Sequence, residues 1–354
     1  MTIQCGAPDL KNKFRTLIRY HYSESDYNTH FGGTPLETLL FRDNPITDYR
    51  TSWNTDEYDE ALQEILDPGY YQDLDIGISL FAGYSDGMPN FHLVSLKRDF
   101  DRRLRELRQA LSDVNHFLLE EKPKKLIQPL MPRIESRLER GTALFRSRIG
   151  FAARAYPMHG GDWFEERHYR PYEAKTLGAP PPPVAGIGRM NRAGVSFLYL
   201  ASTAETALAE IRPHPGHYCS IGSFRAQRTL RIADLTDLDP CDFAISDREL
   251  ENFVLLRSID EVLSVPVVPE SREQYHLSQL LADAFRQLCY DGACYRSPVG
   301  LGKNYVLFDP ATFEYEAGSA TVARVDNVTY VSAQVPNMGT DDNDYWTAPD
   351  GSFL

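Results

Sequence analysis

The sequence is poor in the features that mark secreted, zinc-binding and membrane-spanning proteins. It has five cysteines, an odd number, with no CxxC pair and no nearby histidines to complete a zinc set. This cysteine usage is typical of a reduced, cytoplasmic protein. No apolar stretch approaches the roughly 20 residues of a membrane span, and the first residues lack the apolar core of a signal peptide. We therefore expect a cytoplasmic protein with no metal site and no membrane contact.

Positive charge is also scarce. The 37 lysines and arginines are outnumbered by 50 aspartates and glutamates, and the formal net charge is −13. Tight non-specific binding to nucleic acid needs clustered basic side chains, so we expect no direct nucleic-acid partner. A small anion held in a local basic pocket is still compatible with this charge. The 354 residues, 42% of them hydrophobic, suffice for about two globular domains.

Several common catalytic motifs are missing. The chain has no G-x-x-x-x-G-K-[ST] phosphate loop, no G-x-S-x-G nucleophile turn and no H-E-x-x-H zinc helix. Gly186 and Gly188 are not followed by a third glycine that opens a helix. A dinucleotide-binding fold of the Rossmann type is therefore disfavoured.

The region before residue 140 carries a helical pattern. Apolar residues spaced three and four apart from Phe100 to Leu118 predict an amphipathic helix that continues until Pro123. Its apolar stripe must be covered, either by the same chain or by a second copy in a homodimer. We favour packing within its own domain for the stripe, and a homodimer as the assembly of the whole protein.

The pattern of residue types along the sequence changes near residue 140, which predicts a domain boundary there. Pro132 is suited to the first turn of a short helix over Arg133–Arg140, and Gly141 to its C-cap. We predict a mainly helical N-terminal domain over residues 1–140, a second domain over 141–335 and an acidic tail over 336–354. The elements predicted in the second domain are strands at Ala143–Phe145, Val195–Leu200, Asn304–Phe308 and Val328–Val331, a helix opened by a capping box from Ser202 to Glu205, and a helix over Gln274–Cys289.

Glu210 is a candidate functional residue. It lies in the segment TALAEI, on a mostly apolar helix that Pro213 is expected to end. A carboxylate buried there without a partner would cost several kcal/mol or remain protonated. Either the group has a function, or it is exposed near the helix end or paired with Arg212.

Five sequence elements follow one another in a fixed order. They are Arg146 in LFRSRIG, Arg189 in GRMN, Tyr199 in FLYLA, Glu210 in TALAE and Ser297 in CYRSPVGLGKNYVLF. In this order they resemble the RES domain, a family named for an arginine, a glutamate and a serine. The resemblance covers roughly residues 141–310, and GRMN departs from the commoner G-R-W-N. Arg212-Pro213 stands where shorter members often have a histidine.

The resemblance implies an α+β fold like that of the ADP-ribosyltransferases, with a split β-sheet. It also implies a helical N-terminal domain of the kind found in a long-chain subgroup. NAD+ would be the substrate, and no prosthetic group is expected. Characterised relatives are toxins that an Xre-type antitoxin counters. Some act as NAD+ phosphorylases or glycohydrolases, transferring ADP-ribose to phosphate or water, which is the reaction we predict; transfer to a protein or nucleic acid is the alternative.

The resemblance also implies roles for the carboxylate and the serine. Cleavage of the nicotinamide–ribose bond develops positive charge on the sugar, and a nearby carboxylate stabilises that charge. Glu210 would take this role and orient the nucleophile. Ser297 would bind a ribose hydroxyl or the nicotinamide amide; it is a poor nucleophile because no histidine is placed by sequence to activate it.

The remaining candidates suit the anionic and aromatic parts of NAD+. Guanidinium groups bind phosphate oxygens through paired hydrogen bonds, which makes Arg189 and Arg146 candidates for the pyrophosphate. Arg148 is a rival to Arg146. Tyr199 can pack its ring on nicotinamide.

A different class of function would place the chemistry in the N-terminal region. Arg15 and His21 fit the R-x4–6-H spacing of HEPN nucleases. Such a pair arises readily by chance, so we rank an HEPN-like RNase below NAD+ cleavage.

Overall fold

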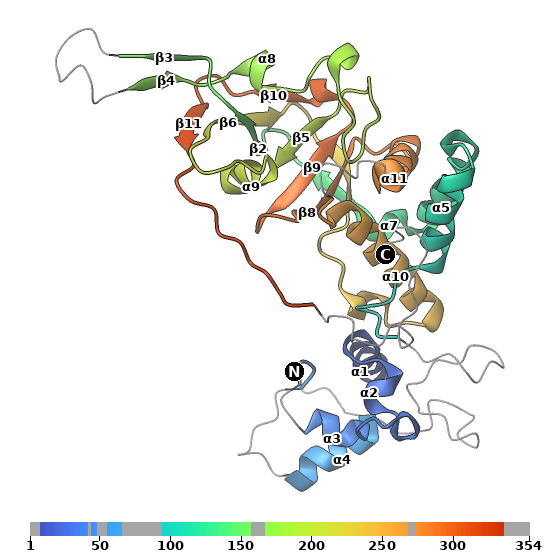
Figure 1. Cartoon of the computed structure of the whole chain (residues 1–354). Coiled ribbons are helices and arrows are strands. Elements are labelled where there is room, and N and C mark those ends of the chain that lie inside the picture. Colours follow the sequence, from blue (N-terminus) through green and yellow to red (C-terminus); the bar gives the residue numbers. More distant parts are fainter. Residues whose placement is uncertain are drawn as a thin grey trace, which may run out of the picture.

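The computed structural model describes residues 8–41, 44–47, 55–65, 94–156, 167–267 and 274–335. The predicted acidic tail over 336–354 lies outside these residues. Within them, no helix has the length and apolar character that crossing a membrane would require. The described chain combines helices with a β-sheet core, as an α+β fold requires (Figure 1).

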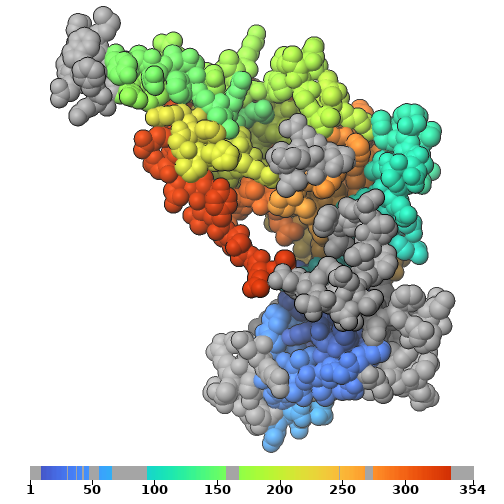
Figure 2. Space-filling view, viewed as in Figure 1, coloured from blue at the N-terminus to red at the C-terminus, as the bar shows by residue number. Residues whose placement is uncertain are grey.

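The first helices form a small lobe with its own apolar core. Ile18, Leu40 and Leu62 are almost completely buried in this core. Tyr20 packs edge-on against Phe253, with ring centroids 6.0 Å apart. Figure 2 shows this lobe, in blue, at one end of the molecule. Its elements are α1 (Pro8–His21), α2 (Glu24–Tyr27), η1 (Thr29–Phe31), α3 (Leu36–Leu40) and α4 (Thr55–Ile65).

The long helix predicted up to Pro123 is shorter than its sequence pattern. It ends at Asp113, and Val114 is extended. Pro123 lies within the first turn of the next helix, where a missing N–H is tolerated. The elements of this stretch are α5 (Arg102–Asp113), η4 (His116–Leu118), α6 (Glu121–Ile127), η5 (Gln128–Leu130) and α7 (Met131–Ile134).

The helix predicted over Arg133–Arg140 is wrong. Residues 135–138 form strand β1, which pairs antiparallel with β7. The sheet therefore includes a strand from before residue 140, while the three-part domain division itself stays a prediction. Gly141 adopts φ +84°, the left-handed conformation that favours glycine, in the turn leading to β2.

The main sheet has nine strands in the described chain, with the order β1-β7-β8-β9-β5-β2-β6-β10, and β11 pairs with β6. Only the β7–β8 pair is parallel. Strand β2 pairs with β6 over seven residues but with β5 only at Phe145↔Ala201. The strands are β1 (Glu135–Leu138), β2 (Ala143–Ile149), β5 (Leu198–Ala201), β6 (Tyr218–Ala226), β7 (Leu230–Asp234), β8 (Gly292–Arg296), β9 (Lys303–Leu307), β10 (Phe313–Tyr315) and β11 (Thr321–Arg324).

The predicted strand at Val328–Val331 is not formed; those residues have no helix or strand. A separate hairpin, β3 (Ala153–Ala155) with β4 (His168–Arg170), extends from the sheet (Figure 1).

The helix that ends at Glu210 is capped at its N-terminus by Thr203 and not by Ser202. The Thr203 hydroxyl accepts a hydrogen bond from the Thr206 N–H. The remaining elements are α8 (Ala174–Leu177), η6 (Pro182–Val184), α9 (Ala204–Glu210), η7 (Pro240–Phe243), α10 (Asp247–Ser264), α11 (Tyr275–Gln287) and η9 (Pro310–Thr312).

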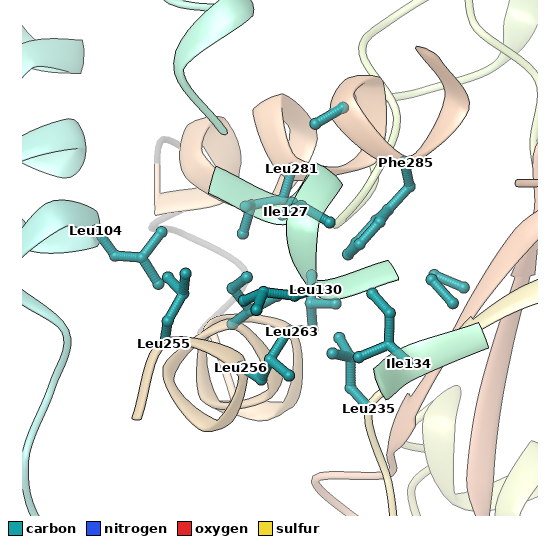
Figure 3. Close-up of a cluster of buried hydrophobic side chains, with 14 of the residues drawn as sticks. Leu104, Ile127, Leu130, Ile134, Leu235, Leu255, Leu256, Leu263, Leu281 and Phe285 are labelled. Carbon is teal, nitrogen blue, oxygen red and sulfur yellow. The ribbon is translucent and has the colours of Figure 1, made fainter. Parts of the chain in front are cut away.

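The two faces of the sheet carry different cores. In β5, Leu198 and Leu200 belong to a cluster on one face, whereas Tyr199 packs with the larger cluster formed by α10 and α11 on the other. Helices α5 to α7 contribute Leu104 and Ile127 to this larger cluster (Figure 3). Leu104 and its neighbour on the stripe, Leu107, are thus covered by the same chain. The helices that α5 packs on, α10 and α11, lie beyond residue 140, so the favoured prediction that the stripe packs within its own N-terminal domain is wrong.

Candidate active site

Glu210 is the last residue of α9 and is half-buried. Its Oε1 atom accepts two hydrogen bonds, from Ser297 Oγ at 2.5 Å and from Asn304 Nδ2 at 2.7 Å. No described residue donates a hydrogen bond to Oε2, and none of the contacts of Glu210 involves Arg212. The carboxylate is therefore held through one oxygen while the other is free for a further ligand. Ser297 was a sequence candidate; Asn304 was not, although it begins the quoted segment NYVLF.

Ser297 uses its hydroxyl to fix a loop against Glu210. While it donates to the carboxylate, Oγ accepts from the backbone N–H groups of Gly300 at 2.9 Å and Val299 at 3.3 Å. The end of the loop is fixed as well, because the Gly302 N–H donates to Thr206 Oγ1 on α9. The one proton of the hydroxyl goes to the carboxylate and both lone pairs accept backbone N–H groups, so Ser297 anchors its loop to Glu210 in this structure.

The GRMN segment forms a tight turn that Tyr199 secures. The Gly188 N–H donates to the Asn191 carbonyl oxygen at 3.0 Å. The Tyr199 hydroxyl donates to Asn191 Oδ1 at 2.7 Å and accepts from the Met190 N–H at 3.0 Å. A Cβ at Gly188 would lie 2.2 Å from Asn191 Oδ1, so the turn requires glycine at this position. The hydroxyl of Tyr199 thus has a structural task, and burial raises its pKa.

Arg189 leaves this turn without a carboxylate partner among the described residues. Its Nη1 makes a long hydrogen bond of 3.5 Å to the Val262 carbonyl oxygen in the last turn of α10. Its guanidinium lies 5.5 Å from the ring centroid of Tyr275, at the start of α11. A cation held so weakly can turn towards an anionic ligand at little cost.

Arg146 lies where β2 and β5 separate. Its Nη1 donates to the Tyr199 carbonyl oxygen at 3.1 Å, and in the described chain it forms no ion pair. Burial lowers the pKa of Arg146 to about 10, so the guanidinium remains protonated at neutral pH. Arg148 is exposed and engaged elsewhere, with the Thr176 carbonyl at 2.5 Å and the Tyr172 ring at 4.8 Å. Of the two, Arg146 is the one placed beside Tyr199.

Tyr295 is a further residue of this region that sequence reasoning missed. It is the cross-strand partner of Asn304 and is 3% exposed. Burial raises the pKa of Tyr295, and the groups that act on it electrostatically include Arg189, Tyr199 and Glu210. Tyr295 therefore belongs to the region that contains Arg189, Tyr199 and Glu210. Its place two residues before Ser297, in the strand that Ser297 follows, was the available signal.

The rival pair from the N-terminal region lies on α1, where Arg15 and His21 are six positions apart on one helix. Burial, with a smaller contribution from Lys97, lowers the pKa of His21. The described residues contain no group of three or more histidine, cysteine, aspartate or glutamate side chains able to hold a metal ion.

Comparison with known proteins identifies the region that contains Glu210. Residues 154–327 match the family model of the RES domain, which confirms the resemblance seen in the sequence. Arg189, Tyr199, Glu210 and Ser297 fall within this match, and Arg146 lies before it. No curated protein matches the chain. A chain from the crystal structure of the M. tuberculosis MbcT–MbcA toxin–antitoxin complex aligns with a TM-score of 0.31 and 13% identity, over 56% of this chain and 92% of that chain; at that score the likeness supports no conclusion.

Proposed function

We propose that this chain, whose residues 154–327 are a RES domain, is an NAD+-consuming enzyme that cleaves the nicotinamide–ribose bond and transfers ADP-ribose to phosphate or water. One observation carries the proposal. The Glu210 carboxylate is fixed by two donors on Oε1, and no described residue donates to Oε2. A carboxylate with one fixed and one open oxygen is suited to stabilise a positive charge on a bound sugar.

The proposed step breaks the bond between C1′ of the ribose and N1 of nicotinamide. The bonding electrons leave with nicotinamide, which becomes neutral, and C1′ becomes electron-poor. Glu210 Oε2 would accept a hydrogen bond from a ribose hydroxyl or from the nucleophile, and its charge would stabilise the developing cation. An oxygen of phosphate or water then bonds to C1′, and the proton that an attacking water gives up passes to solvent. NAD+ is the substrate in this scheme, and the step needs no prosthetic group.

Arg189 and Arg146 would bind the pyrophosphate of NAD+. Both guanidinium groups lack a carboxylate partner in the described chain and donate only to backbone carbonyl oxygens. Tyr199 would offer its ring to nicotinamide, because its hydroxyl is already engaged with the GRMN turn. An ADP-ribosyltransferase-like split sheet accords with the single pair that joins β2 to β5.

Incubation of the pure protein with NAD+, with and without phosphate, tests the proposal. We expect free nicotinamide in both reactions. Mass spectrometry should find ADP-ribose 1″-phosphate if phosphate is the acceptor and ADP-ribose if water is. Undiminished NAD+ in both reactions would refute the proposal. NAD+ labelled in its ADP-ribose part tests the alternative, an ADP-ribosyltransferase with a macromolecular acceptor. If the label appears only on added protein or nucleic acid, this alternative is favoured.

Replacement of Arg189 by lysine should raise the KM for NAD+ about tenfold. Lysine keeps the charge but loses the paired donors of guanidinium, and one charge-assisted hydrogen bond contributes roughly 1.5 kcal/mol. Steady-state kinetics at varied NAD+ concentration measure the change. Arg225→Lys is the matched control, because Arg225 lies on β6, which β5 and β2 separate from β9, and pairs with Glu316. Unchanged KM and kcat in Arg189→Lys would remove Arg189 from the site.

The proposed activity also leads to proposals about the partners, the cellular localisation and the assembly of the protein. An enzyme that depletes NAD+ is toxic to the cell that makes it, so we propose control by an antitoxin protein of Xre type and action in the cytoplasm. We propose a homodimer as the assembly. The molar mass from light scattering tests the dimer, and co-purification with a protein encoded beside this chain tests the antitoxin.

A further inference from the structure

One turn of α10 contacts two distant parts of the chain. The Arg257 side chain donates to the Asp99 carbonyl oxygen, and Ser258 Oγ accepts from the Asp101 N–H at 2.9 Å. Asp101 in turn caps α5, accepting hydrogen bonds from the N–H groups at the start of that helix. Two residues further along α10, Asp260 forms an ion pair with Arg296. The stretch that begins α5 and the residue that precedes Ser297 are therefore fixed to the same helical turn.

The Asp260–Arg296 pair is built around a buried carboxylate. Asp260 is 1% exposed, whereas the Arg296 side chain is 62% exposed. Arg296 donates to Asp260 Oδ2 through Nε at 2.8 Å and also through Nη2. Ser264 Oγ donates to Oδ1 at 3.1 Å. A carboxylate so buried requires its cation, so Arg296 has little freedom to leave.

Arg296 is adjacent in sequence to Ser297, whose hydroxyl holds Glu210 at 2.5 Å. The backbone at Ser297 is thus placed by α10 on one side and by the loop to Gly302 on the other. A hydrogen bond weakens steeply when its angle falls, and a misplacement of about 1 Å in an active site can cost on the order of 10²-fold in rate. Loss of the ion pair would therefore displace the Glu210 carboxylate, although neither residue of the pair contacts substrate.

We infer that Arg296 and Asp260 are positioning residues that set the place of Ser297 and, through it, of the Glu210 carboxylate. Helix α10 then links the segment at residues 99–101 to the same carboxylate. The inference rests on the proposed function, and it adds a route by which the region before residue 140 affects the reaction. Arg296 itself binds no substrate in this scheme.

Three variants test the inference. Arg296→Gln combined with Asp260→Asn removes both charges and leaves no unpaired buried ion, while Arg296→Gln and Arg296→Lys test the arginine alone. We expect kcat to fall about 10- to 100-fold in the double variant, with the KM for NAD+ changed less than about threefold. Arg296→Lys keeps the charge and should recover part of the kcat lost in Arg296→Gln. Arg324→Gln, at the exposed pair with Asp326, is the control and should change neither constant.

Hydrogen exchange supplies a readout that does not depend on activity. The amides of Val299 and Gly300 donate to Ser297 Oγ, so their exchange should be faster in the double variant than in the wild type. Faster exchange with lowered kcat supports the inference. Folded variants with wild-type exchange, or with wild-type kcat, overturn it, and a raised KM at constant kcat overturns it in favour of direct substrate binding. If the wild type does not consume NAD+, the proposed function fails, while the exchange measurement still decides whether the ion pair fixes the loop.

Discussion

Replacement of Glu210 by glutamine should lower the kcat for NAD+ cleavage by about 10²- to 10⁴-fold while the protein remains folded. Glutamine has the size of glutamate, and its amide oxygen can still accept from Ser297 and Asn304 in place of Oε1. The second position then carries an NH₂ donor instead of a negatively charged oxygen. The variant thus removes the charge that we expect to act on the ribose and keeps the bonds that hold the side chain.

The control for this prediction lies on the same helix. Glu205 is exposed in the first turn of α9, so Glu205→Gln should retain wild-type kcat. Chromatography of the nicotinamide released measures the turnover of the wild type and of both variants. Circular dichroism checks that all three proteins are folded. A folded Glu210→Gln variant with wild-type turnover would show that Glu210 does not carry the reaction.

Replacement of Ile127 by alanine should reduce the free energy of unfolding by about 2–5 kcal/mol. Ile127 ends α6 and is fully buried among residues of α10 and α11 (Figure 3). Removing three carbons there leaves a cavity that the surrounding helices can fill only in part. Urea denaturation followed by circular dichroism measures the loss.

The same measurement tests whether the region before residue 140 unfolds with the sheet. Unfolding should remain a single transition, shifted to lower urea, because α6 shares its core with α10 and α11. Leu118→Ala is the control: Leu118 is 66% exposed, and its loss should change stability by less than about 0.5 kcal/mol. An Ile127→Ala variant as stable as the wild type would mean that this core contributes little to the fold.

The elements predicted best from sequence were those whose apolar residues keep a regular spacing. The helix predicted over Gln274–Cys289 is α11, and its apolar face, including Leu281 and Phe285, is buried. The NYVLF strand is β9. By contrast, α10 gave no helical signal, because Phe253, Val254, Leu255 and Leu256 are consecutive and all buried. A helix with apolar residues on several sides loses the apolar periodicity that sequence reading depends on. Helix α11 keeps its periodicity because two of its other buried positions are the polar residues Ser278 and Gln279.

The candidate site was found only in part, for a related reason. The resemblance to the RES domain supplied Glu210 and Ser297, which the structure brings into contact across 87 positions of sequence. Asn304 and Tyr295 meet the site only because β8 and β9 pair in one particular register. No spacing rule predicts a register between strands joined by a loop of this kind, and so neither residue was a candidate.

The narrow connection between β2 and β5 has a mechanical consequence. This one residue pair joins two parts of the sheet, which we call leaves. One leaf consists of β1, β7, β8, β9 and β5, and the other of β2, β6, β10 and β11. Helix α9 packs chiefly on β2 and β6 in one leaf, whereas Ser297 and Asn304 come from the end of β8 and from β9 in the other. The bonds of Glu210 therefore bridge the two leaves and stiffen the joint between them. In the proposed scheme the sugar engages Oε2 and leaves both bonds of Oε1 in place, so the two leaves should keep their relative position while the sugar is bound.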